Sequence, residues 1–245
     1  MRLSTYRQPN KYDEENPYWI SFSDIMAGLL VIFVMAVLAL ILELTQTRAD
    51  VTQAIKELAK AEQVRREILD EIAQELKKKN IEVEVVDNHT VLRIPDELLA
   101  FENNRYTIPN DPSVRKTVRE IGKALYDAIT MLNRWEYLDT IFIEGHTDRR
   151  PSPRKLGNWG LSTFRAISVW NFWNDQLPTD ARLANLKNHS GKFLFSVSGY
   201  GATRPVTATQ NTEAEFRQNR RIDIRFTVKR PALEDFKNIK KLISQ

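Results

Sequence analysis

A single aspartate, Asp24, interrupts an apolar run from Ile20 to Leu42, and from Ile25 onward the run has no charged residue. A carboxylate in hydrocarbon costs about 3 kcal/mol or more unless it is neutralised, paired or hydrated, so such a group is usually functional. We expect Asp24 to bind and release a proton, or less readily Na⁺, since few other oxygen ligands lie nearby. Ser21 and Ser23 are candidate neighbours of this proton site, although small residues there equally suit helix packing.

The second set of candidate residues lies in the C-terminal half, in four pieces. Residues 143–148 read IEGHTD, residues 158–166 read NWGLSTFRA, residues 199–201 read GYG, and residues 219–224 read NRRIDI. Each piece alone is weakly specific: Asp148 could cap a turn and Arg165 could form a structural ion pair, while Gly199 and Gly201 suit turns because glycine has backbone freedom.

The apolar run must be a helix if it is to hold Asp24 at lipid depth. About 23 helical residues extend roughly 34 Å, enough to cross a bilayer. A signal peptide has a shorter apolar part after a basic start, whereas acidic residues 13–15 precede this run, so an uncleaved anchor is favoured. We predict a polar tail over 1–19 and a transmembrane helix over 20–44. Alternatively, Asp24 lies at headgroup depth as an acid near the helix N-terminus.

Residues 45–80 contain no Gly or Pro and many strong helix formers. Their apolar residues form an imperfect heptad seam that Glu62 and Arg65 interrupt. A solvated, charged helical linker explains this pattern. Pairing with a second copy, or packing on a membrane partner as a spacer or plug, explains it as well.

From Ile81 the pattern changes to alternating strands and helices. The sequence predicts a β-hairpin over 81–94, strands over 140–144, 193–198 and 222–228, and helices over 114–132 and 161–177. The expected fold class is therefore a single N-terminal transmembrane helix, a helical linker, and a two-layer α/β (α+β) domain over 81–230. A basic helix over 231–245 ends the chain.

Composition excludes several classes of function. The 245 residues carry 36 Lys and Arg against 32 Asp and Glu, a mild excess that gives little support for nucleic-acid binding. The chain has no cysteine, so disulfides and thiolate metal sites are excluded, and its three histidines lack ligand spacing to one another. With no nucleophile–base arrangement or paired catalytic carboxylates, we expect neither an enzyme nor a cofactor.

The four pieces together, in this order, resemble the OmpA-like peptidoglycan-binding family over about residues 81–230. The resemblance implies that Asp148 accepts from the ammonium side of diaminopimelate in a stem peptide, and that Arg165 forks onto its carboxylate. It also implies that Asn158 and Thr147 shape the loop, and that Arg220 and Arg221 border the pocket. The loop from Asp148 to Asn158 departs from the family's common form, because it is slightly longer and carries extra basic and proline residues.

The whole arrangement resembles MotB-type stator subunits of ion-driven motors, and within them the ZorB subunits of Zorya anti-phage systems. This resemblance implies a homodimer surrounded by a pentamer of a MotA-like (ZorA-like) membrane protein. It also implies an inner-membrane location, with the N-terminus in the cytoplasm and the large domain in the periplasm. A flagellar stator subunit is the second interpretation, and a passive tether from membrane to wall is the third.

Overall fold

The structure is a computed structural model that describes residues 17–231. The described part of the chain divides into two compact units, one that ends at Gln53 and one that begins at Ala54. Most of the predicted N-terminal tail, and all but the first residue of the predicted C-terminal helix over 231–245, lie outside the described residues.

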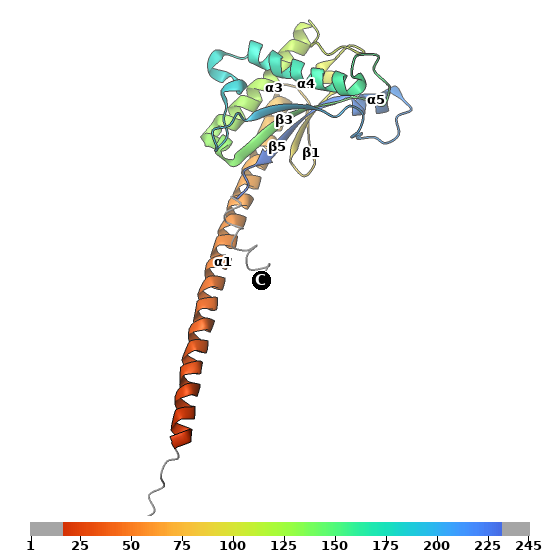
Figure 1. Cartoon of the computed structure of the whole chain (residues 1–245). Coiled ribbons are helices and arrows are strands. Elements are labelled where there is room, and N and C mark those ends of the chain that lie inside the picture. The colour runs from red at the N-terminus through yellow and green to blue at the C-terminus, as the bar shows by residue number, and fades with distance from the viewer. Residues whose placement is uncertain (1–16, 232–245) are drawn as a thin grey trace, which may run out of the picture. The chain divides into compact units, whose positions relative to one another are not determined.

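The first helix, α1 (Pro17–Lys78), is one continuous element (Figure 1). Lys77 and Lys78 lie in its last turn, where cations complement the helix dipole. Within the described residues it is the one helix that is, by length and composition alone, long and apolar enough to cross a membrane. Its apolar side chains between Ile20 and Leu42 are nearly all exposed in the isolated chain.

The second unit contains a five-stranded mixed sheet. Its strands are β1 (Glu84–Val86), β2 (Val91–Pro95), β3 (Leu138–His146), β4 (Phe195–Gly199) and β5 (Arg221–Val228). The spatial order is β1-β2-β5-β3-β4, in which only β3 and β4 are parallel. A parallel pair needs a crossover, and α4 (Gly157–Gln176) supplies it between β3 and β4.

Two of the remaining helices, α3 and α5, begin at residues whose side chains satisfy free backbone N–H groups. In α3 (Pro112–Thr130), the Asp111 carboxylate accepts from Ser113 N at 2.8 Å and Val114 N at 3.0 Å, and Pro112 opens the helix. In α5 (Glu213–Asn219), Thr212 and Glu215 form a capping box. The short elements are α2 (Asp96–Leu99) and the 3₁₀ helices η1 (Met131–Tyr137), η2 (Thr179–Ala181) and η3 (Leu183–Asn185).

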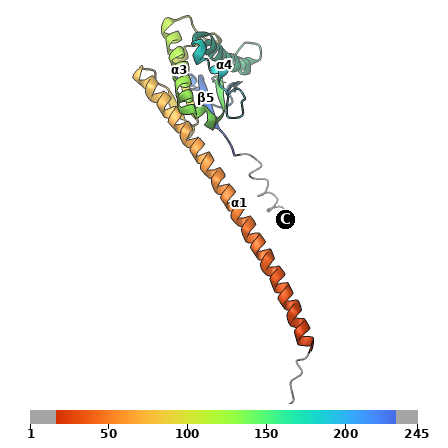
Figure 2. The ribbon, with the colours of Figure 1, turned by 90° about the vertical axis from the view of Figure 1, so that its left-hand side faces the viewer.

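One hydrophobic core joins the sheet to α3, α4 and the C-terminal part of α1. The part of α1 that belongs to this unit contributes Val64, Ile68, Leu69, Ile72 and Leu76, all at most 4% exposed. Figure 2 shows this part of α1 beside α3. Two ion pairs support the packing, Lys79–Glu120 at 2.9 Å and Arg134–Glu71 at 2.6 Å.

The prediction of a solvated linker or separate seam over 45–80 is therefore corrected for its second half. The apolar residues from Val64 to Leu76 pack against their own sheet and helices, and Arg65 is buried with its Nε donating to His89 O at 2.9 Å. Ile55 and Leu58 remain exposed. The folded domain thus begins within α1, well before residue 81.

Replacing Leu69 by alanine tests this boundary. Leu69 is fully buried, so Leu69→Ala is expected to lower the free energy of unfolding by roughly 3 kcal/mol through lost transfer energy and a residual cavity. Leu58→Ala on the same helix, where the side chain is partly exposed, should cost less than about 1 kcal/mol. Denaturant unfolding of the full chain in detergent measures both, and equal losses would contradict the assignment of Leu69 to the core.

The expected fold class is confirmed: an apolar N-terminal helix precedes a two-layer α/β domain with a mixed sheet. The hairpin and the three further strands are present, with bounds shifted by one to three residues. Gly199 corrects the prediction of a turn glycine, because a Cβ there would lie 2.2 Å from Thr163 Oγ1, so close packing of α4 on β4 requires it. Gly201 does adopt positive φ, at 53°.

Candidate functional site

A pocket of about 190 Å³ opens where β3 ends and α4 begins. This is the place where ligands generally bind in α/β units, outside the carboxyl end of a strand. Its lining consists of Asn103, Asn104, Thr147, Asp148, Arg150, Pro151, Asn158, Leu161, Arg165 and Arg220. Five of the six wall-binding residues predicted from the sequence therefore line one cavity.

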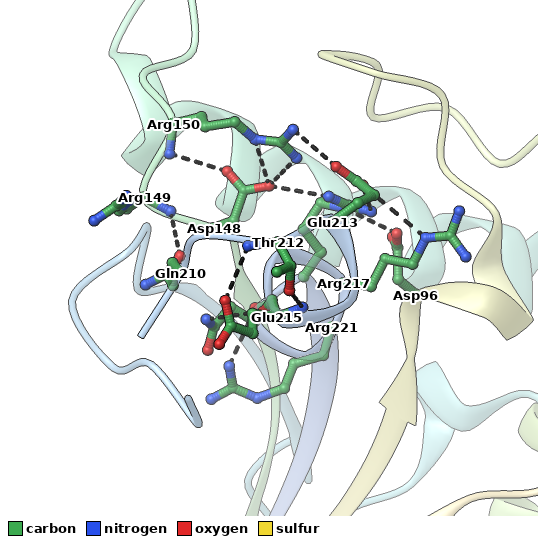
Figure 3. A network of polar contacts seen from close by, with 12 residues as sticks. Asp96, Asp148, Arg149, Arg150, Gln210, Thr212, Glu213, Glu215, Arg217 and Arg221 are labelled. Atoms are coloured by element: carbon green, nitrogen blue, oxygen red, sulfur yellow. Dashed lines mark hydrogen bonds and ion pairs between the residues drawn. The ribbon is translucent and has the colours of Figure 1, made fainter. Parts of the chain in front are cut away.

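The Asp148 carboxylate is the anionic centre of the pocket, and the residue is 5% exposed. Its Oδ1 accepts from the backbone N of Arg150 at 3.0 Å, and its Oδ2 accepts from Arg150 Nε at 3.1 Å and Arg220 Nη1 at 3.0 Å. Figure 3 shows Arg150 against Asp148. Burial opposes ionisation, but the hydrogen bonds from the two arginines outweigh it and hold the pKa of Asp148 below its ordinary value.

Arg220 ties three carboxylates from distant parts of the chain together. Its guanidinium contacts Asp96 at 2.8 Å, Asp148 at 3.0 Å and Glu213 at 3.0 Å. Burial raises the pKa of Asp96, and the charge of Arg220 offsets only part of that rise. Arg220 therefore holds the end of β2, the end of β3 and the start of α5 together around the pocket.

Arg165 lies buried in α4 and holds the opposite wall of the pocket. Its Nε donates to Arg105 O at 2.9 Å and its Nη2 donates to Glu102 O at 3.2 Å. Burial lowers the pKa of Arg165 to about 10, so the side chain stays charged at neutral pH. Within the described residues Nη1 has no hydrogen-bond partner, which leaves this nitrogen to contact a ligand.

The side-chain amide of Asn158 forms hydrogen bonds with the backbone of the loop that follows Asp148. Its Oδ1 accepts from Ser152 N at 3.0 Å, and its Nδ2 donates to Arg150 O at 3.0 Å and to Asp148 O at 3.3 Å. It lies in the first turn of α4 rather than before the helix. The predicted orienting role fits this geometry, whereas a direct polar contact to a ligand would require one of these bonds to open.

Thr147 and His146 are buried beside the pocket. The backbone N of Thr147 donates to Gly201 O at 2.9 Å, and within residues 17–231 its hydroxyl has no partner. The His146 ring stacks on the Tyr200 ring, with the ring centroids 5.3 Å apart. Burial, and then the charge of Arg221, lower the pKa of His146 to about 3, so this histidine is neutral at physiological pH.

Arg221 does not border the pocket, which corrects the prediction. Its Nε donates to Asp223 Oδ2 at 3.0 Å and its Nη2 donates to Arg204 O at 3.0 Å. Asn103, Asn104, Arg150 and Leu161 line the pocket but were absent from the predicted site. The sequence feature that could have identified Arg150 is the excess of basic residues in its loop. For Asn103 and Asn104 the sequence shows only that they lie in a loop.

Asp24 lies two turns into α1, beyond the first turn in which the helix dipole acts. This position gives no support to the interpretation of a helix N-terminal acid. Ser21, three residues earlier, shares its side of the helix, whereas Ser23 points about 100° away. Within the described residues the Asp24 carboxylate makes no hydrogen bond or ion pair. Over residues 17–231 there is also no cluster of three His, Asp or Glu that could hold a metal ion.

Comparisons with known proteins give relatives of the domain and of the chain as a whole. Residues 100–220 match the OmpA family. The chain is similar to the Zorya protein ZorB of Escherichia coli, with 24% identity over 227 residues that cover 87% of this chain and 89% of the relative. Motility protein B of Bacillus subtilis is 30% identical over 86 residues, which cover 34% of this chain and 28% of the relative.

A solved MotB-like protein from Desulfovibrio vulgaris shares the fold, with a TM-score of 0.51, 19% identity, and coverage of 70% of this chain and 99% of that one. An apolar helix of membrane-spanning length before an OmpA-family domain fits a membrane anchor. Residues 100–220 of this chain therefore match the OmpA family, and the chain resembles the Zorya protein ZorB along most of its length and shares the fold of a MotB-like protein.

Proposed function

We propose that this chain is the peptidoglycan-anchored subunit of a proton-driven motor in the bacterial inner membrane, and that the motor acts in anti-phage defence. The observation that carries the proposal is the similarity to ZorB, which covers 87% of this chain and is therefore much longer than the match to the OmpA family over residues 100–220. A domain match alone would support only anchoring. Neither a catalytic role nor a cofactor is part of the proposal.

The ligand proposed for the pocket is the diaminopimelate residue of a peptidoglycan stem peptide. The lining side chains carry one carboxylate, Asp148, and three guanidinium groups, those of Arg150, Arg165 and Arg220. A pocket with one anion and a cationic excess suits a zwitterionic group with an extra carboxylate. The free Nη1 of Arg165 supplies a contact for that carboxylate, and guanidinium bonds to carboxylates are among the stronger hydrogen bonds in proteins.

Asp24 is proposed to carry the proton. Hydrocarbon favours its neutral form, and contact with water on either side allows ionisation, so protonation changes which partner surface the helix prefers. Each proton that crosses the membrane supplies about 2.3 kcal/mol per 100 mV, plus the contribution of the pH gradient. Na⁺ suits the site less because few other oxygen ligands accompany the carboxylate.

The partners proposed are a second copy of this chain and a pentamer of a ZorA-like membrane protein. The N-terminus would lie in the cytoplasm and the OmpA-family domain in the periplasm, where peptidoglycan is found. With the wall holding the dimer still, movement would appear in the surrounding pentamer. The similarity to motility protein B supports a flagellar stator subunit as the second candidate.

Deleting the gene separates these candidates. A defence motor is expected to leave swimming intact and to raise the plating efficiency of phage to the level of an undefended host. A flagellar stator subunit would instead lose swimming without a change in phage plating. Restoration by the full-length chain is the control, and an unchanged phage phenotype after deletion would overturn the defence assignment.

Wall binding is expected to be independent of pH between about 5 and 7. Burial opposes ionisation, but hydrogen bonds from Arg150 and Arg220 hold the pKa of Asp148 below its ordinary value, so its carboxylate is ionised over this range and loses its charge only at more acidic pH. The pKa of His146, lowered to about 3, adds no transition. Co-sedimentation of the full chain with purified sacculi measures this profile. A midpoint near pH 6 would contradict this expectation, and Asp96, whose pKa burial raises and which pairs with Arg220 at 2.8 Å, would then be the first group to test.

A further inference from the structure

Two guanidinium groups share the Asp148 carboxylate, but they are held differently. The Arg220 side chain is 15% exposed and pairs with three carboxylates. The Arg150 side chain is 47% exposed and reaches Asp148 from within the same loop. Arg220 is therefore a fixed part of the pocket, whereas solvent already reaches Arg150.

Arg150 also has contacts that do not depend on Asp148. Its Nη1 lies 3.0 Å from Glu213 Oε2, and its guanidinium carbon lies 4.1 Å from the centroid of the Phe216 ring. Both partners belong to α5. Arg150 can thus lose its contact with the Asp148 carboxylate and keep an ion pair and a cation–π contact. These remaining contacts lower the free-energy cost of breaking the contact with Asp148.

A ligand ammonium would need the place that Arg150 holds. Asp148 Oδ2 accepts from both Arg150 and Arg220, and Oδ1 accepts from the backbone of Arg150. An incoming cation must therefore compete with a guanidinium that already neutralises the same oxygen. A ligand that offers only a carboxylate has no reason to displace Arg150.

We propose that Arg150 is an internal competitor for the Asp148 carboxylate, which the ammonium of a ligand must displace, so that this contact lowers the affinity of the pocket for ligands that carry an ammonium. The inference rests on the proposed wall-binding function and deepens it. The ammonium takes the Asp148 carboxylate while the ligand carboxylate meets Arg165. Arg150 then stays on Glu213 and Phe216. The contact between Arg150 and Asp148 weakens the binding of such zwitterions by its own free energy and leaves ligands that carry only the carboxylate unaffected.

The test compares two soluble stem peptides on the full-length chain in detergent. One peptide ends in meso-diaminopimelate, and the other ends in 2-aminopimelate, which keeps the distal carboxylate but lacks the distal amine. Arg150→Ala is expected to bind the first peptide roughly three- to tenfold more tightly, as removal of a partly exposed competing ion pair implies. Its affinity for the second peptide should not rise.

Arg149→Ala is the matched control. It removes the same charge one residue away, and its side chain donates to Asn211 Oδ1 at 3.2 Å without touching Asp148. Its affinity for both peptides should stay within about twofold of the wild type. Thermal unfolding of both variants checks that the fold is retained.

The outcomes separate this inference from the function on which it rests. Weaker binding of the diaminopimelate peptide by Arg150→Ala would show that Arg150 holds the ligand directly, and would overturn the inference alone. Equal effects of Arg150→Ala and Arg149→Ala, or equally tighter binding of both peptides by Arg150→Ala, would show that only the loss of a positive charge matters. Either result would overturn the inference too. If the wild type binds neither peptide and Asp148→Asn changes nothing, the proposed wall-binding function fails together with the inference.

Discussion

Asp24→Asn is expected to abolish phage defence completely, while the chain still inserts in the membrane and still binds the wall. Asparagine has nearly the size and polarity of a protonated aspartate but cannot release a proton. The helix would thus be fixed in the neutral state, and the cycle of protonation that drives the partner would stop. Phage plating on cells that express the variant measures the effect, and proton flux through the complex in proteoliposomes measures its cause.

Ser23→Ala is the matched control for this experiment. It changes a polar residue next to Asp24, at the same depth but on a different side of the helix, and it should retain defence. Membrane fractionation must show equal amounts of all variants. Defence that survives Asp24→Asn at normal expression would remove the ion-carrier role and leave a passive tether as the better interpretation.

Asp148→Asn is expected to weaken binding to sacculi by at least roughly 30-fold, because one partner of a buried charge pair with the ligand ammonium is lost. The fold should survive, since Arg220 keeps its bonds to Asp96 and Glu213. Co-sedimentation with sacculi measures the loss. Defence should fall as well, because an unanchored dimer would turn with its partner.

The control here is Asp175→Asn, which makes the same change at an exposed position on α4 away from the pocket. It should bind sacculi like the wild type. A tether and a motor also separate at this point: a tether loses function with Asp148→Asn alone, and a motor loses it with Asp24→Asn as well. Undiminished wall binding by Asp148→Asn would contradict the assignment of the pocket.

Local patterns were enough to predict most of the fold. Alternating and periodic apolar residues located the hairpin, the strands and the two long helices of the domain, because these patterns reflect which side of an element is buried. The same reasoning could not find the partner of α1. An apolar seam on a helix shows that something covers it, and a second copy, a membrane protein or the chain's own sheet satisfies it equally well.

The site residues that belong to the four ordered sequence pieces could be predicted. Those whose place in the pocket depends on the direction of the side chain could not. Four short pieces in order brought Asp148, Asn158 and Arg165 together across the chain. Arg220 and Arg221 looked equivalent in the sequence, yet Arg221 begins β5, where neighbouring residues point to opposite faces. Only one of them can reach the pocket. The contact between Arg150 and Asp148 depends on the path of a loop, which no periodicity encodes.

The place where this domain starts has a practical consequence for anyone who wishes to isolate it. A fragment that begins at residue 81 would lack five core side chains of α1, and one that begins at residue 100, where the family match begins, would also lack Ile81, Leu92, Ile94 and Leu99. Either fragment would expose apolar surface that α1 covers in the folded domain. Such a piece would be prone to aggregate rather than fold. The smallest autonomous portion of this chain must therefore retain the last four to five turns of α1.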